Sequence, residues 1–338
     1  MSRVLVTGAS GFIGMHLVAA LTARGDEVAC LVRKSSNVER LKPFGVRLVH
    51  GDVTNDDGLA EAIGDREVVY HLAGCTLALK NRQFYEVNRR GVVHVVKACA
   101  GCQTPPTVVF VSSLAAAGPT VDGRPRVESD MPQPVSHYGQ SKRSGEHVAE
   151  SFAHRVPISV VRPPIVLGEG DRISLPMFRS VIRFGVHLAP GIKPQRFSVI
   201  HAADLSHLLI LAAERGRRLP PLGESGHPPG QGYYFAACEQ DPYYSDLGRL
   251  IAESVGRHVL VIPAAIPVVR GVAAMGEAIG QVVHQPLFMN LDKAREIAAG
   301  SWVCSAQAAR EQLGFEVGAS LVERLRQTAE WYEREGWM

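Results

Sequence analysis

The sequence predicts an α/β protein built on a doubly wound parallel sheet. Three observations lead to this fold class: short apolar runs rich in β-branched residues, helix-period segments between them, and a glycine-rich turn directly after the first run. The runs are almost continuously apolar, as strands covered on both faces must be. Their alternation with helical segments indicates parallel strands with helices on both sides of one sheet. The expected strands are 4–6, 27–32, 46–51, 67–73, 107–113 and 158–164, and the first expected helix is 12–23.

Composition limits the partners and the compartment that we expect. The chain has 338 residues, 46% of them apolar, which is enough to bury a large core. Its 36 basic residues exceed its 33 acidic residues by only three and are scattered, so we expect no nucleic-acid partner. The six cysteines show no disulfide spacing, and the N-terminus lacks the order of a signal peptide. We therefore expect a cytoplasmic protein.

The sequence pattern changes after residue 167. We expect residues 1–167 to form the sheet domain and residues 168–338 to form mainly a smaller lobe, with a return of the chain to the sheet near 196–240. In this second half, helical periodicity occurs at 204–215 and 244–256, and clustered Pro and Gly predict a surface loop at 216–232.

The stretch 259–283 is the most apolar part of the chain. Pro263, Pro267, Arg270 and Glu277 interrupt it before 18 apolar residues have passed, so we expect no membrane-spanning helix. Three interpretations remain open for this stretch: a lid over a substrate pocket, ordinary packing or dimer contact, and a peripheral contact with a membrane.

The glycine-rich turn after the first run predicts a phosphate-binding site. In Thr7–Gly14 (TGASGFIG), Gly8 permits a tight turn, Gly11 lets the backbone approach a pyrophosphate, and Gly14 allows close packing of helix on strand. The helix that follows would offer N–H donors and the positive end of its dipole to the phosphates. A dinucleotide-binding domain is therefore expected over residues 1–167.

Tyr138 and Lys142 form the clearest candidate for proton transfer. Their spacing of four residues, in a segment that reads as the start of a helix, places both side chains on one helix face. A phenol with a pKa near 10 is a poor acid or base at neutral pH, but a nearby ammonium group favours its phenolate. The segment follows a strand that ends in Ser112 and Ser113.

These motifs together resemble the extended branch of the short-chain dehydrogenase/reductase superfamily, the NAD(P)-dependent epimerase/dehydratase family. The resemblance covers essentially the whole chain and is closest to the 3-beta-hydroxysteroid dehydrogenase and dihydroflavonol reductase-like branch. It implies a Rossmann-type nucleotide-binding sheet and a substrate-binding lobe. The motifs that carry it are Gly8-x-x-Gly11-x-x-Gly14, Asp52-Val53, His71-Leu72-Ala73-Gly74, Val87-Asn88 with Gly91, Ser112-Ser113, Tyr138-x-x-x-Lys142 and Arg162-Pro163-Pro164.

The resemblance implies a role for each matching residue. Ser113, Tyr138 and Lys142 would be catalytic: Tyr138 would move the proton, and the Ser113 hydroxyl would stabilise the substrate oxygen. The implied cofactor-binding residues are Gly8, Ser10, Gly11, Phe12, Ile13, Gly14, Arg33, Lys34, Asp52, Val53, Leu72, Ala73, Gly74, Asn88, Ser112, Tyr138, Lys142, Pro163 and Ile165. A capping role for Asn88 and a turn-forming role for Asp52 stay open beside these.

The end of the second run favours NADP(H), with NAD(H) as the alternative. A carboxylate there would hold a ribose 2′-hydroxyl and repel a 2′-phosphate. This sequence instead has Arg33 and Lys34, followed by Ser35 and Ser36. A guanidinium group matches phosphate geometry, although both cations could also be solvated loop charges.

The expected activity is hydride transfer between the nicotinamide and a ketone or secondary alcohol of an apolar small molecule. The first alternative is an NAD-dependent nucleotide-sugar epimerase, and the second is a non-catalytic cofactor-binding regulator. Leu114 and Ala115 stand where sugar dehydratases carry an acidic pair, which disfavours that chemistry. The histidines and cysteines have no metal-ligand spacing, so no metal is expected. By resemblance, helices at 84–102 and 138–154 would form a homodimer.

Overall fold

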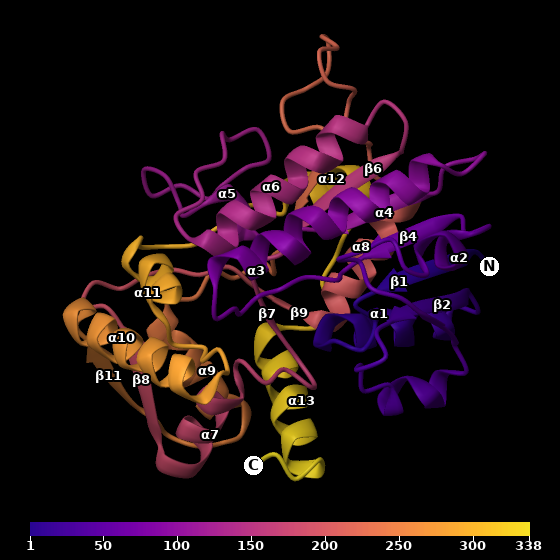
Figure 1. Ribbon diagram of the computed structural model, residues 1–338. Helices are drawn as coiled ribbons and strands as arrows, with labels where there is room; N and C mark the ends of the chain where they lie inside the picture. Colours follow the sequence, from indigo (N-terminus) through magenta and orange to yellow (C-terminus); the bar gives the residue numbers. More distant parts are fainter.

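A seven-stranded parallel sheet runs through the centre of the larger part of the protein, in a computed structural model that describes residues 1–338 (Figure 1). Its strand order is β10-β6-β5-β4-β1-β2-β3, and every pair is parallel. The fold class predicted from the sequence is therefore confirmed. The strands are β1 (Arg3–Thr7), β2 (Glu27–Val32), β3 (Arg47–His50), β4 (Val68–His71), β5 (Thr107–Val111), β6 (Ile158–Arg162) and β10 (Tyr233–Phe235).

Helices cover both faces of this sheet, because successive strand residues point to opposite sides. In β1, Val4 and Val6 join one buried core, whereas Leu5 joins the other. The first core is closed by α1 (Phe12–Ala23), α8 (Ala202–Arg215) and α12 (Gln307–Leu313). The second is closed by α2 (Leu59–Ile63), α4 (Gly91–Ala100) and α6 (His137–Phe152).

Short elements connect these layers and border the carboxyl edge of the sheet. A strand pair, β7 (Ile165–Leu167) with β9 (Val199–His201), lies beside the main sheet and is also parallel. The other connecting elements are the 3-10 helix η1 (Glu39–Phe44), α3 (Asn81–Tyr85), the π-helical turn η2 (Glu86–Arg90) and α5 (Leu114–Ala117).

A smaller lobe lies at one end of the molecule, at the lower left of Figure 1. Its two-stranded parallel sheet pairs β8 (Val186–Pro190) with β11 (Leu260–Ala264). The helices of this lobe are α7 (Leu175–Phe184), α9 (Tyr244–Ser254), α10 (Ile266–Val283) and α11 (Leu291–Ala298), and α13 (Leu321–Arg334) packs against α9.

The second half of the chain contributes to both parts of the molecule. The helices expected at 204–215 and 244–256 appear as α8 and α9, and the loop expected at 216–232 contains no helix or strand. After that loop the chain returns to the main sheet as the edge strand β10, which pairs with β6. The expected runs 46–51, 67–73, 107–113 and 158–164 extend one or two residues beyond the ends of the strands, as at β5, which ends at Val111.

Helix α10 corrects one expectation from the sequence. The prolines of 259–283 do not interrupt it, because Pro263 belongs to β11 and Pro267 lies in the first turn of the helix, where a missing N–H costs nothing. The result is one continuous helix of 18 residues with a mean hydropathy of 1.3, of which 17% is buried. By length and composition alone, α10 is the one helix of the chain that could cross a membrane.

Candidate active site

Backbone atoms pack tightly against the glycine-rich turn after β1. Gly8 has a φ of +73°, and a Cβ atom there would lie 2.7 Å from the backbone nitrogen of Ala73. A Cβ atom on Gly14 would lie 2.3 Å from the carbonyl oxygen of Gly8, so α1 packs directly on the turn. Gly11 is different: its backbone is extended, with a φ of −80°, and the residue is exposed. A Cβ atom on Gly11 would lie 3.2 Å from the carbonyl oxygen of Gly8, a close contact but a milder one than at Gly8 or Gly14.

The N-terminus of α1 is open to an anion. The helix has no side-chain cap and no acidic residue in its first turn. Its first N–H groups lack partners within the helix and lie at the positive end of the helix dipole. Ser10, Gly11, Phe12 and Ile13 form this end. The turn and the helix start therefore fit the two phosphates of a dinucleotide, which backbone N–H groups would hold.

Two cations stand at the end of β2, on the same edge of the sheet as the glycine turn. Arg33 and Lys34 are exposed, and the N–H of Arg33 donates to the hydroxyl of Ser36 at 3.1 Å. Burial raises the pKa of the Cys75 thiol, and the charge of Arg33 opposes this rise. The charge of Arg33 therefore reaches Cys75, in the segment that follows β4 at the same edge of the sheet.

Asp52 forms a turn after β3. Its Oδ1 atom accepts hydrogen bonds from the N–H and the hydroxyl of Thr54, both at 2.9 Å. These contacts support the turn-forming role of Asp52. Its Oδ2 atom accepts no hydrogen bond from the protein. Val53 is buried beside Gly91, where a Cβ atom would lie 3.1 Å from the valine side chain.

Asn88 fastens the segment after β4 to helix α6. It lies inside the π-helical turn η2 and is buried, so it does not cap a helix. Its amide exchanges two hydrogen bonds of 2.8 Å with the backbone of Cys75 and donates a third, of 2.9 Å, to the hydroxyl of Ser141. These bonds fix the turn formed by Leu72, Ala73 and Gly74, which leads from the sheet edge toward the active-site candidates.

Ser113 and Tyr138 come together at the carboxyl end of β5. Ser113 begins α5, and its hydroxyl oxygen accepts the N–H of Ala115 at 3.1 Å. Burial raises the pKa of the Tyr138 phenol to about 12, and a hydrogen bond with Ser113 opposes this rise. Ser112 is buried and still belongs to the sheet edge, because its N–H donates to Val161 at 2.8 Å. Of the two serines, Ser113 is the one beside the phenol.

Lys142 lies in α6, one turn after Tyr138, and its side chain is buried. Its Nζ atom donates a 2.7 Å hydrogen bond to the carbonyl oxygen of Val111 and lies 4.9 Å from the centre of the Phe110 ring. Burial lowers the pKa of Lys142 to about 8, although the charge of Glu146 raises it. From the sequence we expect an ammonium that favours the phenolate of Tyr138. In the protein alone, burial dominates and the phenol stays protonated at neutral pH.

A buried ion pair holds α6 against β6. Arg162 donates two hydrogen bonds of 2.8 Å to the carboxylate of Glu146, and both side chains are almost fully buried. Burial alone would raise the pKa of Glu146, but the charge of Arg162 lowers it below its usual value. The residues after Arg162 also contact the candidate site. The carbonyl of Pro163 accepts the N–H of Leu114 at 2.8 Å, and Ile165 packs in the same apolar cluster as Tyr138.

The smaller lobe contributes residues that the sequence did not reveal. The carboxylate of Asp292, in α11, accepts the backbone N–H groups of His137 and Tyr138 at 2.8 and 3.1 Å. One turn further on, the carboxylate of Glu296 accepts the hydroxyl of Ser136 at 2.7 Å. Asp292 and Glu296 are more than 150 positions from the residues that they bind, so no local motif could have indicated these contacts.

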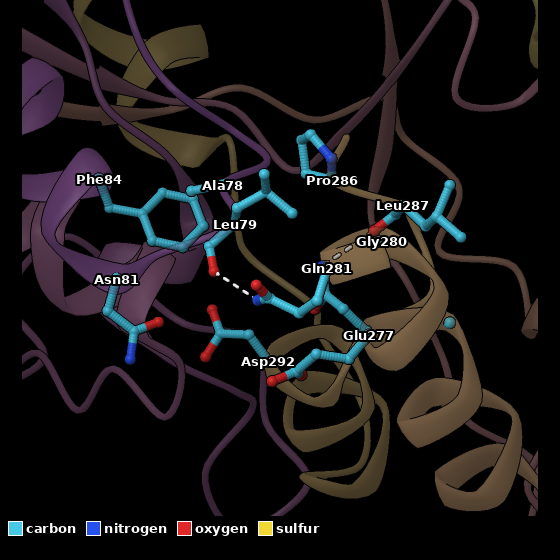
Figure 2. A pocket seen from close by; sticks show the side chains of 12 residues that line it. Ala78, Leu79, Asn81, Phe84, Glu277, Gly280, Gln281, Pro286, Leu287 and Asp292 are labelled. Atoms are coloured by element: carbon cyan, nitrogen blue, oxygen red, sulfur yellow. Dashed lines mark hydrogen bonds between the residues drawn. The ribbon is translucent and has the colours of Figure 1, made fainter. Parts of the chain in front are cut away.

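A hollow beside Tyr138 lies between the segment after β4 and helix α10 (Figure 2). The ring of Phe84, on its wall, is 6.1 Å from the ring of Tyr138. The side-chain amide of Gln281 donates a 3.1 Å hydrogen bond to the carbonyl of Leu79 and so ties α10 to this segment. The hollow is lined by Ala78, Leu79, Asn81, Phe84, Gly276, Glu277, Gly280, Gln281, Pro286, Leu287, Asn290 and Asp292.

The parallel sheet, the glycine turn and the open helix N-terminus define a Rossmann-type dinucleotide-binding protein. Comparison with known proteins makes this assignment more specific. A model of the NAD dependent epimerase/dehydratase family matches residues 4–223, and the chain belongs to this family. It is therefore an NAD(P)-dependent enzyme of the extended short-chain dehydrogenase/reductase type, as the motifs predicted.

Relatives over most of the chain are reductases and dehydrogenases. A ceramide reductase of Caulobacter vibrioides is 28% identical over 338 residues, 99% of this chain and 96% of the relative. A 3 beta-hydroxysteroid dehydrogenase type 7 of Mus musculus is 29% identical over 71% of this chain and 69% of its own length. Among solved structures, DesIV, a dTDP-glucose 4,6-dehydratase from Streptomyces venezuelae with NAD bound, matches with a TM-score of 0.78. It is 21% identical, covers 99% of this chain and 98% of its own, and supports the fold alone.

Proposed function

We propose that the protein is an oxidoreductase that transfers hydride between a nicotinamide dinucleotide and a ketone or secondary alcohol of an apolar substrate. The observation that carries this proposal is the packing of the first turn of α6, which bears Tyr138, against α5, which Ser113 caps, at the carboxyl edge of the sheet. This edge also carries the glycine turn and the open start of α1. Ligands bind at the carboxyl ends of the strands in sheets of this kind.

In this proposal each of the three catalytic residues handles one part of the chemistry at the substrate oxygen. Tyr138, whose pKa lies near 12, is protonated at neutral pH and donates its proton to the oxygen of a ketone. The Ser113 hydroxyl donates a hydrogen bond to the same oxygen while it gains negative charge. The ammonium of Lys142 stabilises the phenolate that remains. When bound, the nicotinamide supplies the hydride to the carbonyl carbon or accepts it from the alcohol.

The apolar character of the proposed substrate rests on the hollow and on the relatives. Leu79, Phe84 and Leu287 give the hollow apolar walls beside Tyr138. The two relatives named above act, by their names, on ceramide and on a steroid, which are both apolar molecules. The hollow is also lined by five polar residues, Asn81, Glu277, Gln281, Asn290 and Asp292. A long apolar molecule with one ketone or hydroxyl group suits this combination.

The proposal also covers the preferred dinucleotide, the oligomeric state and the location of the protein. We propose a preference for NADP(H), because Arg33 and Lys34 stand where a carboxylate would select NAD(H). We propose a homodimer through α4 and α6, which lie side by side on the outside of the sheet (Figure 1). A cytoplasmic location fits the six cysteines, which are all free.

The test is a screen for oxidation of NADPH and NADH with long-chain, steroid, flavonoid and sugar ketones. We expect NADPH consumption with an apolar ketone, and Tyr138→Phe should lower turnover by about 10²- to 10⁴-fold while dinucleotide binding persists. Tyr85→Phe is the matched control, since its hydroxyl lies 3.4 Å from Gln140 of the same helix α6.

Three results would contradict the proposal. Activity only as redox-neutral epimerisation of a nucleotide sugar would assign the protein to the epimerases. Dinucleotide binding without turnover of any ketone or alcohol would assign it a regulatory role. Near-normal turnover in Tyr138→Phe would remove Tyr138 as the proton donor.

A further inference from the structure

Helix α10 is built the opposite way from an ordinary surface helix. Its buried stripe consists mostly of small residues, and its solvent-facing stripe consists of large apolar ones. The buried positions are Val269, Ala273, Gly276 and Gly280. The exposed positions are Val268, Val272, Met275, Ile279 and Val282, each between 45% and 79% exposed. A helix of a soluble domain normally turns its charged face outward, so this exposed stripe indicates a contact with another apolar phase.

The small sheet that leads into α10 repeats this inversion. The register pairs Leu260 with Val186 and Ile262 with Leu188, so these side chains share one face. Leu188, Leu260 and Ile262 are 60%, 64% and 40% exposed, whereas the alternate residue His187 is buried against α9. The face of the sheet that points to solvent is therefore apolar. We call the exposed stripe of α10 and this sheet face together the apolar lobe surface.

The chain segments that form and flank the apolar lobe surface carry a positive net charge. Residues 179–195 and 255–290 contain five Arg or Lys residues and one acid, Glu277, which is a net charge of +4. The whole chain carries +3, so the rest of the protein is close to neutral. None of the five cations forms a salt bridge with a carboxylate in the structure. They are Arg179, Arg183, Lys193, Arg257 and Arg270, and all five are exposed.

We propose that the apolar lobe surface rests on a lipid bilayer with anionic headgroups, as a peripheral contact that does not span it. Large exposed aliphatic side chains enter the headgroup region, and Arg and Lys side chains that form no salt bridge contact lipid phosphates or carboxylates; of these, Arg179 and Arg257 also donate to backbone carbonyls of the protein. This interaction surface goes beyond the proposed oxidoreductase activity and does not depend on it.

Two features favour a surface contact over the alternatives. Gln281 donates to Leu79, and Glu277 accepts the N–H of Leu291, so α10 is tied to the protein on its inner side. A spanning helix would have to break both bonds and carry Arg270 and Glu277 into the hydrocarbon. A symmetric contact between two copies of this surface would bring the same cations together, which is unfavourable.

The proposed contact would bring the bilayer close to the candidate active site. The inner side of α10 contributes Gly276, Gly280 and Gln281 to the hollow of Figure 2. Phe84 and Asp292, which also line this hollow, both contact Tyr138. One helix therefore has the proposed lipid contact on its outer side and the hollow on its inner side. An apolar molecule dissolved in the bilayer would have a short path to this hollow.

The test is co-sedimentation of the full chain with vesicles of phosphatidylcholine, with or without about 30 mol% phosphatidylglycerol. We expect binding to the anionic vesicles that weakens as salt is added. The double variant Val272→Glu/Ile279→Glu should bind at least ~10-fold more weakly. Met131→Glu/Leu222→Glu is the matched control, because these side chains are 79% and 67% exposed outside the smaller lobe, and it should bind like the wild type. Circular dichroism of both variants establishes that they are folded.

Four results would overturn the proposal. The first is failure of the wild type to bind anionic vesicles. The second is equal loss of binding in the stripe variant and the control. The third is a wild-type dimer that dissociates in the stripe variant, which would assign the surface to a second copy of the chain. The fourth is resistance of membrane-bound protein to alkaline carbonate extraction, which would make α10 a spanning helix. None of these readouts uses enzymatic activity, so their outcome is independent of the proposed reaction.

Discussion

Asp292 accepts the backbone N–H of Tyr138 at 3.1 Å, although the two residues are 154 positions apart in the chain. Asp292 belongs to α11 of the smaller lobe, and Tyr138 lies in the first turn of α6 in the dinucleotide-binding part. A carboxylate at a helix N-terminus satisfies otherwise free N–H groups and interacts well with the helix dipole. The smaller lobe therefore helps to fix the helix turn that carries the proposed proton donor.

Replacing Asp292 by Ala should lower both stability and turnover. Loss of a capping side chain costs about 1 kcal/mol in the free energy of unfolding, and turnover should fall because the first turn of α6 is less firmly held. Asp246→Ala is the matched control: each Asp lies in the first turn of its helix and pairs with an Arg three residues later. Denaturant unfolding, kcat and the dinucleotide Kd are the measurements. Asp292 acts on Tyr138 only by position, so kcat should change while the dinucleotide Kd does not; equal kcat in both variants would contradict this role.

Two glycines of the same turn should respond to alanine in different ways. In Gly14→Ala the new methyl group meets the backbone of Gly8 and Ala9, so we expect a loss of about 1–3 kcal/mol or more in the free energy of unfolding. In Gly11→Ala the backbone is extended and the new methyl group would lie 3.2 Å from the carbonyl oxygen of Gly8, which a small shift can relieve, so we expect a smaller loss of stability than in Gly14→Ala. The methyl group of Gly11→Ala would occupy the space proposed for the pyrophosphate, and the dinucleotide Kd should rise at least ~10-fold. Chemical denaturation and calorimetric titration separate the two effects. Wild-type affinity in Gly11→Ala would show that the phosphates bind elsewhere.

How much the sequence could predict depends on how local each feature is. The strands were found because a strand covered on both faces must be apolar along its length, as in β1 and β5. Tyr138 and Lys142 were found because their spacing is a property of one helix. The contact of Asp292 with α6 was not predictable, since a pairing between lobes leaves no period in the sequence. The continuity of α10 does not follow from the sequence pattern, because a proline such as Pro267 normally interrupts a helix and only its place in the first turn makes it compatible.

The buried ammonium of Lys142 should make stability depend on pH. Its pKa in the folded protein is about 8, below the ordinary lysine value of 10.5, so between these values the unfolded chain binds more protons than the folded one. The free energy of unfolding therefore rises with pH in this window on account of Lys142, by at most ~1.4 kcal/mol per pH unit. Denaturation of the wild type and of Lys142→Met from pH 8 to pH 10 isolates the effect, because their difference should shift in favour of the wild type. Lys97→Met, at an exposed lysine of α4, is the control and should show no such trend.

The pH window ends at pH 10 because Tyr138, with its pKa raised to about 12, contributes with the opposite sign above it. A constant difference between wild type and Lys142→Met would contradict the buried charge.

Arg33 should decide the choice between the two dinucleotides. A guanidinium group on a 2′-phosphate forms charge-assisted hydrogen bonds worth about 1.5–3 kcal/mol, so Arg33→Ala should raise the Kd for NADPH about 10- to 100-fold. The Kd for NADH, which lacks this phosphate, should stay within about twofold of the wild-type value. Arg47→Ala is the matched control, because this arginine is also exposed but stands at the opposite end of the neighbouring strand β3. Fluorescence titration of both dinucleotides with both variants gives the four constants, and added salt should weaken NADPH binding more in the wild type than in Arg33→Ala. Equal losses for NADPH and NADH would make Arg33 a general contact to the dinucleotide, and an unchanged Kd for NADPH would leave it as a solvated loop charge.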